Sequence, residues 1–293
     1  MSIFVDKNTR VLVQGITGKE GSFWTRHMIG LGTNVVAGVT PGKEGQIVEN
    51  VKVFNTVRRV VRECNINASV LFVPPAFAKD AVFEALDSGI KKIVVIAEGV
   101  PVHDAMQIRT GSRSVGAMVI GGNTSGVITP EVSMMGIFPY WIKRVYKKGS
   151  IGVITRSGSL TNEVTAMVVK AGFGVSSLIG IGGDSVPCTR FAEVLPLFEE
   201  DHETDALVMI GELGGTMEEE VAEEIKSRRF TKPVIAFIAG RTAPIGKRMG
   251  HAGAIATAGK GTVAGKIEAL SKAGALIAER PSQIGELIKT CLN

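Results

Sequence analysis

The chain has 293 residues, which is long enough for two domains of ordinary size, each with its own hydrophobic core. Hydrophobic residues make up 45% and charged residues 21%, as in ordinary soluble globular proteins. The formal net charge is +5 without a long run of Lys or Arg, and only 5% of the residues are aromatic, so no nucleic-acid surface is indicated.

The first residues, Met1-Ser2-Ile3-Phe4-Val5-Asp6-Lys7, become polar too early for a secretory signal peptide. No apolar run approaches the roughly 18 residues that a membrane span requires. The three cysteines, Cys64, Cys188 and Cys291, form neither a CxxC pair nor a metal-binding spacing, and their odd number is typical of reduced thiols. We therefore expect a soluble cytoplasmic protein with no membrane contact.

The first half of the chain alternates short β-branched runs with longer amphipathic stretches. Buried strands are predicted at 11–14, 35–38, 69–73, 93–96 and 118–120. Helices are predicted between them at 20–30, 57–64 and 79–88. Strand, helix and strand at this spacing are typical of a parallel sheet with helices on both faces.

The alternation stops after Gly126. Residues 127–149 contain two prolines and a basic cluster, and are predicted to form an irregular connection with room for a short hairpin. A second alternation then predicts strands at 151–154, 175–179, 207–210 and 234–238, with helices at 160–171, 191–199, 217–226, 263–272 and 282–291. We therefore expect two doubly wound α/β domains with a boundary between about 125 and 150.

Glycine loops mark the candidate ligand sites, because ligands bind such sheets beyond the carboxyl ends of the strands. The loop Gly15–Gly21 follows the first strand and opens a helix, so its N–H groups can bind phosphate oxygens; a structural tight turn is the alternative. It departs from the G-x-G-x-x-G fingerprint of dinucleotide sites. The loop after the second strand carries Lys43 and has no acid at the strand tip, which favours a nucleotide with an extra phosphate over NAD; a solvated loop lysine is the alternative.

Two loops of the second half carry candidate chemistry. Ser157 and Ser159 stand at the start of a predicted helix and indicate another anion site. A serine hydrolase is not indicated, because the G-x-S-x-G motif is absent. Glu212 ends a strand before two glycines, so its carboxylate can orient an imidazole; a helix-capping acid is the alternative.

His251 lies in Gly250-His251-Ala252-Gly253, between neighbours without bulk, with Lys247, Arg248 and Lys260 close in sequence. Imidazole is nucleophilic near neutral pH and can carry a covalent group between two half-reactions. Glu212 is its predicted orienting acid, and an ordinary loop histidine is the alternative. The other histidines, His27, His103 and His202, are predicted to be structural or solvated, and no pair has metal spacing.

Together these motifs resemble the α subunit of succinyl-CoA synthetase (succinate–CoA ligase, NDP-forming) along almost the whole chain. The similarity is carried by Gly15–Gly21, Gly38–Lys43, Val53–Val57, Ala97–Pro101, Arg156–Leu160, Gly180–Asp184, Gly211–Gly215 and Gly250–Ile255. The resemblance implies an α/β fold in which a Rossmann-like CoA-binding domain (1–126), a connection (127–149) and a flavodoxin-like ligase domain (150–293) follow one another.

The resemblance also implies a tricarboxylic acid cycle ligase that joins succinate to CoA through an acyl phosphate and a phosphohistidine. His251 would be the phosphohistidine, Glu212 would orient it, and Ser157, Gly158 and Ser159 would bind the phosphoryl group. CoA would lie on Thr17, Gly18, Lys19, Gly21, Lys43, Pro74, Ile96, Glu98 and Asn123. An ATP-grasp β subunit, in an αβ or α2β2 heteromer, would bind most of the ATP or GTP with its Mg²⁺, and this chain would supply no metal ligand.

Two departures from the family pattern bear on the acid. Thr124 replaces a cysteine in the usual Gly-Pro-Asn-Cys-Pro-Gly, and Asn162 replaces a tyrosine in a stretch closer to ATP-citrate lyase and citryl-CoA synthetase. The sequence favours succinate, with citrate or malate as alternatives. A non-catalytic CoA-sensing module and an NAD(P)-dependent dehydrogenase are the other candidates. A non-catalytic CoA-sensing module would not need Ser157, Gly158, Glu212 and His251 together. A dehydrogenase is disfavoured because Lys43 follows the second strand and no ribose-binding acid stands at the strand tip.

Overall fold

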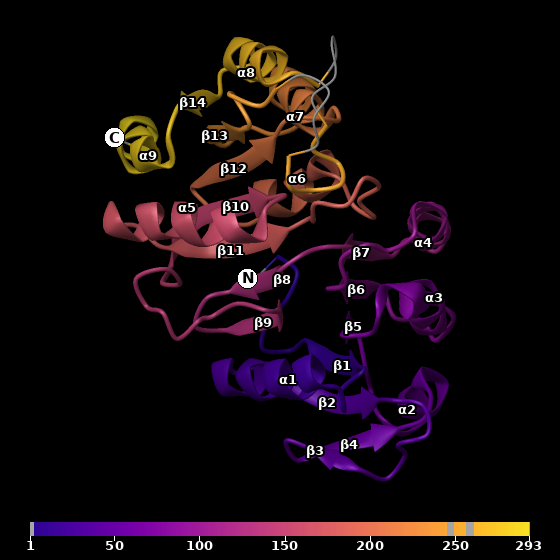
Figure 1. The fold of residues 1–293 in the computed structure, drawn as a ribbon. Coiled ribbons are helices and arrows are strands. Elements are labelled where there is room, and N and C mark those ends of the chain that lie inside the picture. The colour runs from indigo at the N-terminus through magenta and orange to yellow at the C-terminus, as the bar shows by residue number, and fades with distance from the viewer. Residues whose placement is uncertain (1–2, 245–248, 256–260, 293) are drawn as a thin grey trace. The chain divides into compact units, whose positions relative to one another are not determined.

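The computed structural model describes residues 3–244, 249–255 and 261–292 (Figure 1). The chain divides into two compact units. The N-terminal unit consists of Phe4–Phe138 and Val186–Thr189, and the C-terminal unit consists of Met1–Ile3, Pro139–Ser185 and Arg190–Asn293. Over the described ranges, no helix combines the length and the apolar character needed to span a membrane.

The N-terminal unit is built on a parallel sheet with the order β3-β4-β2-β1-β5-β6-β7, in which only β3 is antiparallel. Its strands are β1 (Arg10–Gln14), β2 (Asn34–Val39), β3 (Ile47–Val48), β4 (Val51–Phe54), β5 (Ala68–Leu71), β6 (Lys92–Val95) and β7 (Met118–Gly121). Its helices are α1 (Lys19–Leu31), the 3₁₀ turn η1 (Pro75–Phe77), α2 (Val57–Glu63), α3 (Ala78–Asp87) and α4 (Val102–Ser114). Apart from the short β3, this order is that of a dinucleotide-binding Rossmann sheet.

One hydrophobic cluster packs α2, α3 and α4 against this sheet. It includes Leu12, Val60, Val82 and Ile108, all without solvent exposure. The central strand β1 is buried on both faces, which explains its continuous apolar run. Gly21 of α1 lets the helix start lie close to the preceding loop, because a Cβ there would come within 2.2 Å of the Gly15 carbonyl oxygen.

In the C-terminal unit the parallel strands have the order β14-β13-β12-β10-β11. They are β10 (Lys148–Thr155), β11 (Val175–Gly180), β12 (Ala206–Glu212), β13 (Val234–Ala239) and β14 (Leu276–Ala278). The helices are α5 (Gly158–Lys170), α6 (Phe191–Glu199), α7 (Met217–Lys226), α8 (Val263–Lys272), the 3₁₀ turn η2 (Pro281–Gln283) and α9 (Ile284–Leu292). This order is flavodoxin-like, so the predicted α/β fold class is confirmed.

Some elements differ from the sequence prediction. Helix α4 was not predicted, because its sequence is polar and buries only Ala105, Ile108 and Ser112. The short hairpin for which the sequence left room in 127–149 is present, formed by β8 (Gly126–Thr129) and β9 (Ser133–Gly136), and it begins one residue earlier. The short strands β3, β4 and β14 were also not predicted, since two to four residues give too little alternation to detect.

Candidate active site

The carboxyl ends of β10 and β12 form the centre of the C-terminal unit's candidate site. The two strands are parallel neighbours, with Thr155 opposite Ile210. The chain passes from β10 to β11 on one side and from β12 to β13 on the other, so the strand order reverses between β10 and β12. Doubly wound sheets bind ligands in the crevice at such a switch point. Arg156 and Ser157 follow β10 directly, and Glu212 is the last residue of β12.

His251 lies against the end of β12. Its Nδ1 is 2.7 Å from Oε2 of Glu212, and the two side chains are 23% and 10% exposed. The ring also packs on Gly183, where a Cβ would lie 2.4 Å from a ring carbon, so only glycine fits that position. Gly253 N donates to Gly183 O at 3.2 Å and fixes the His251 loop. The structure thus brings Glu212 and His251 into contact and leaves the imidazole accessible.

Buried charges surround Glu212. Oε1 of Glu212 lies 3.2 Å from Nε of Arg156, and both side chains are almost fully buried. The backbone N–H of Glu212 donates to Oε1 of Glu218, 3.1 Å away. Glu218 in turn pairs with Lys266, and neither of these two side chains is exposed. The Glu212 carboxylate therefore faces His251 with one oxygen and the Arg156 guanidinium with the other, while its backbone is bonded to Glu218.

The predicted anion site lies at the start of α5. Ser157 is the N-cap, and its Oγ accepts from Leu160 N at 3.3 Å and lies 3.3 Å from Oγ of Ser159. Gly158 begins the helix, and both Gly158 and Ser159 are exposed. Helix N–H groups and two hydroxyls are the donors that a phosphoryl group requires. Because Ser157 follows Arg156, this helix start and the Glu212–His251 pair share one edge of the sheet.

Three basic residues lie close to His251 in the sequence. Lys247, Arg248 and Lys260 lie outside the described residues.

Among the other histidines, burial and the neighbouring Arg26 lower the pKa of His27, which packs against Phe23. His103 and His202 are exposed. The described part of the chain contains no group of three His, Cys, Asp or Glu side chains suited to a metal ion.

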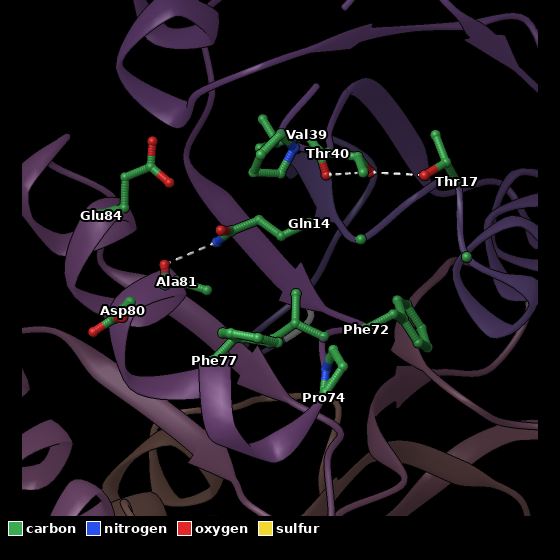
Figure 2. Close-up of a pocket in the computed structure, with 14 residues that line it drawn as sticks. Gln14, Thr17, Val39, Thr40, Phe72, Pro74, Phe77, Asp80, Ala81 and Glu84 are labelled. Carbon is green, nitrogen blue, oxygen red and sulfur yellow. Dashed lines mark hydrogen bonds between the residues drawn. The ribbon is translucent and has the colours of Figure 1, made fainter. Parts of the chain in front are cut away.

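A cavity of about 550 Å³ opens at the corresponding edge of the N-terminal unit (Figure 2). It lies where β1 and β5 adjoin, the switch point of that sheet. Its lining comes from the ends of β1, β2 and β5 with the loops that follow them, from η1 and from α3: Gln14, Gly15, Thr17, Gly18, Val39, Thr40, Pro41, Phe72, Val73, Pro74, Phe77, Asp80, Ala81 and Glu84. A pocket of this size with mostly apolar walls accommodates a nucleotide-sized group.

Three of the predicted CoA residues, Thr17, Gly18 and Pro74, line this cavity. Lys19 and Gly21 follow in the first turn of α1, and Lys43 is exposed in the loop after β2. The remaining ones follow β6 and β7, so they share the sheet edge without lining the cavity: Ile96, Glu98 and Asn123.

The sequence reasoning missed the α3 wall and one strand residue. Phe77, Asp80 and Glu84 have the spacing of a single helix face, which is the signal that could have found them. Gln14 is a buried polar residue at the end of an apolar strand, and its amide donates to Ala81 O and Ser69 Oγ, each at 3.1 Å. In Figure 2, Gln14 reaches across to Ala81 in this way.

The two departures from the family pattern have local hydrogen-bonding roles. Thr124 is buried, and its Oγ1 accepts from Gly126 N at 2.9 Å. Asn162 is exposed on α5, and its Oδ1 accepts from the hydroxyl of Tyr146. Burial raises the pKa of Tyr146, so this phenol stays a hydrogen-bond donor at neutral pH. The oxygen of the Asn162 amide is therefore engaged by Tyr146, and the amide NH₂ is a donor group.

Known proteins resemble the chain along its length. The CoA binding domain family matches residues 6–99, and the CoA-ligase family matches residues 154–276. An ADP-forming sulfoacetate-CoA ligase subunit of an Acholeplasma species is 65% identical over 289 residues, covering 99% of this chain and 98% of its own length. The succinate–CoA ligase [ADP-forming] alpha subunit of Methanothermobacter thermautotrophicus is 51% identical, covering 99% and 97%.

A solved structure shows the same fold. ATP citrate lyase from Methanothrix soehngenii, in complex with citrate and coenzyme A, superposes with a TM-score of 0.90 at 24% identity. It covers 98% of this chain, and this chain covers 50% of it. At that identity the similarity speaks for the fold alone.

Proposed function

The chain belongs to the family of NDP-forming acid–CoA ligase alpha subunits, and on that premise we propose that it uses His251 as a phosphoryl carrier. The overall reaction is acid + CoA + ATP or GTP giving acyl-CoA + ADP or GDP + phosphate. The observation that carries the proposal is the 2.7 Å contact between Glu212 and the accessible imidazole of His251 at the sheet's switch point.

The reaction divides into three transfers. Nε2 of His251 takes the terminal phosphoryl group of the nucleotide, and the nucleoside diphosphate leaves. A carboxylate oxygen of the acid then takes the phosphoryl group from His251, which gives an acyl phosphate and restores the imidazole. The CoA sulfur finally attacks the acyl carbon, so the C–O bond to phosphate breaks and phosphate is released.

Each residue of the C-terminal site has a role in these transfers. Glu212 accepts the Nδ1–H of His251, which makes Nε2 the nucleophile and stabilises the positive charge of the phosphorylated ring. Ser157, Gly158 and Ser159 bind the phosphoryl oxygens at the start of α5. A CoA-sensing module would need none of these groups, so their joint presence favours catalysis.

CoA binds the N-terminal unit in this proposal. The cavity walls from β1, β2 and β5 receive the nucleotide end of CoA, with Thr17, Gly18, Lys19, Gly21 and Lys43 beside its phosphates. Pro74, Ile96, Glu98 and Asn123 follow the sheet edge toward the thiol end. The match of the CoA binding domain family to residues 6–99 supports this assignment over NAD.

Replacing Lys43 with Ala is expected to weaken CoA binding about tenfold, because an exposed cation beside phosphates contributes a charge-assisted contact. The loss shrinks at high salt, which screens that contact. Calorimetric titration of the full chain with CoA measures it. The control is Lys52→Ala, which removes another exposed lysine of the same unit and leaves CoA affinity unchanged; Lys52 lies on β4 and pairs with Glu63 of α2. Equal effects of the two variants, or binding of NAD instead of CoA, contradict the assignment.

The partner in this proposal is an ATP-grasp β subunit, which binds ATP or GTP with Mg²⁺ in an αβ or α2β2 assembly. Its support is that the relatives are named as subunits of ADP-forming ligases. The nucleotide-phosphate chemistry requires Mg²⁺, and the described part of this chain offers no carboxylate cluster to hold it.

Sulfoacetate is the acid we favour. The relative named for sulfoacetate is 65% identical, whereas the one named for succinate is 51% identical. Sulfoacetate carries a carboxylate and a sulfonate, so it matches succinate in charge but presents three acceptor oxygens at its second end. Asn162, whose amide NH₂ is left to donate, fits such an acceptor-rich group. Succinate is the second candidate, as the motifs alone indicate, and citrate or malate follow.

An acid panel tests this choice. The chain and its β subunit are incubated with ATP, Mg²⁺, CoA and sulfoacetate, succinate, citrate or malate in turn, and acyl-CoA is measured by mass spectrometry. We expect kcat/KM for sulfoacetate to exceed that for succinate by about 100-fold, since a site built to bond one anionic group discriminates strongly against another. A preference for succinate makes this chain a succinate–CoA ligase subunit and refutes the sulfoacetate assignment. No acyl-CoA from any acid favours the regulatory module instead.

A further inference from the structure

Arg156 is a buried cation that contacts the second oxygen of the Glu212 carboxylate. Its side chain is 3% exposed, and its Nε lies 3.2 Å from Oε1 of Glu212. Nη1 donates to Gly214 O at 3.2 Å. Nη2 lies so close to Gly253 that a Cβ there would be 2.6 Å away. The guanidinium therefore contacts both the loop that follows Glu212 and the loop that carries His251.

The fold supplies Arg156 at this place because of strand order. It follows β10 directly, and its backbone N–H donates to Ile210 O of β12, the strand that ends in Glu212. Burying a guanidinium is costly unless it is paired and hydrogen-bonded. A side chain needed only for packing at this position would be apolar. The charge is therefore retained for what it does to Glu212.

Further charged groups near Glu212 come from α7 and α8, and the buried Asp184 follows Gly183, on which the His251 ring packs. Glu218 accepts from the Glu212 backbone, and Lys266 bonds Glu218 and donates to Gly214 O at 2.8 Å. Glu219 lies 3.8 Å from Lys266. Glu218 and Lys266 compensate each other, so Arg156 is the cation that directly contacts the Glu212 carboxylate among the described residues.

We propose that Arg156 is a positioning residue that directs Oε2 of Glu212 at Nδ1 of His251. The inference rests on the proposed phosphoryl-carrier role of His251. Without the guanidinium, the Glu212 carboxylate loses the group that Oε1 faces and turns toward another donor. The imidazole then loses its fixed tautomer, and Nε2 is no longer consistently the nucleophile.

The tautomer is measured without turnover. The full chain contains only four histidines, so ¹⁵N-histidine labelling gives four ring systems, and His251→Asn identifies that of His251. In the parent chain we expect the proton on Nδ1 at pH 8. Arg156→Met gives averaged shifts from both tautomers, and Arg156→Lys, which keeps the charge, restores the Nδ1–H form. Arg156→Gln replaces the Met variant if that does not fold. An unchanged tautomer in a folded charge-free variant overturns the proposal.

A double-mutant cycle in the complex with the β subunit provides the kinetic test. Arg156→Met is expected to lower the rate of His251 phosphorylation about 30-fold, the range found when the group behind a histidine is removed. In a Glu212→Gln background, Arg156→Met is expected to alter the phosphorylation rate less than about twofold, because Arg156 acts on His251 through the Glu212 carboxylate, which that background lacks. Equal losses in both backgrounds show a general structural role and overturn the proposal.

Arg229→Met is the matched control, since it removes an Arg–Glu pair on the surface, 63% exposed at Arg229. It leaves tautomer and rate unchanged. Absence of phosphohistidine in the parent complex would refute the carrier role, whereas the tautomer readout would still decide whether Arg156 controls Glu212. The two failures are therefore distinguishable.

Discussion

Replacing His251 with Asn is expected to lower turnover of the ligase complex by at least about 10⁴-fold, because an amide cannot accept and return a phosphoryl group. Asn keeps a short polar side chain that can donate to Glu212, so the loop Gly250–Ile255 retains its contact with β12. The loss therefore lies in chemistry and not in folding. Acyl-CoA formation by the complex with the β subunit measures it.

Two controls make the His251 result specific. His202→Asn changes an exposed histidine of the same unit and leaves turnover unchanged. CoA affinity of His251→Asn, measured by calorimetry, is expected to stay at the parent value, because the cavity proposed for CoA is lined by residues of the N-terminal unit. Turnover of His251→Asn within about tenfold of the parent would contradict a covalent phosphohistidine.

Replacing Glu212 with Gln is expected to lower the rate of His251 phosphorylation by about 10³-fold, by analogy with the tautomer loss seen when the acid behind a catalytic histidine is neutralised. A neutral amide no longer stabilises the cationic ring, and its NH₂ can donate to Nδ1 and reverse the tautomer. It also leaves Arg156 buried beside an uncharged group. Rapid-quench measurement of phosphohistidine formation gives the rate.

The matched control is Glu224→Gln, which neutralises a carboxylate paired with Arg229 on the surface. Its phosphorylation rate is expected to equal that of the parent. The hydrogen bond from Arg229 lowers the pKa of Glu224, and the two variants make the same chemical change from carboxylate to amide beside an arginine. A Glu212→Gln complex as fast as Glu224→Gln would show that the contact with His251 plays no part in catalysis.

Much of the fold was predictable from the sequence because buried parallel strands read as continuous β-branched runs. Every residue of β12 is buried, and its apolar run is correspondingly unbroken. Helix α4 was not predictable in this way, since it buries only one side of a polar sequence. The strand orders depend on pairing between residues far apart in the chain, which local periodicity does not encode.

The candidate site was predictable to the extent that glycine loops mark strand ends. Glu212 ends a buried strand, so a functional carboxylate was expected there, and the structure places it on His251. Arg156 was not singled out, because it lies between Thr155 and Ser157 in a polar loop and nothing local shows that it is buried. The cavity wall of Phe77, Asp80 and Glu84 has the pattern of any amphipathic helix, so only the packing of α3 beside β1 and β5 reveals it.

The most direct measurement follows a single phosphoryl group. The complex of this chain with its β subunit is incubated with [γ-³²P]ATP and Mg²⁺, freed of nucleotide, and then given sulfoacetate and CoA. We predict an acid-labile, alkali-stable label on His251, located by mass spectrometry, that is released completely as phosphate when acid and CoA are both present. Full labelling of a His251→Asn chain, or a label on His251 that no acid with CoA removes, would contradict the account.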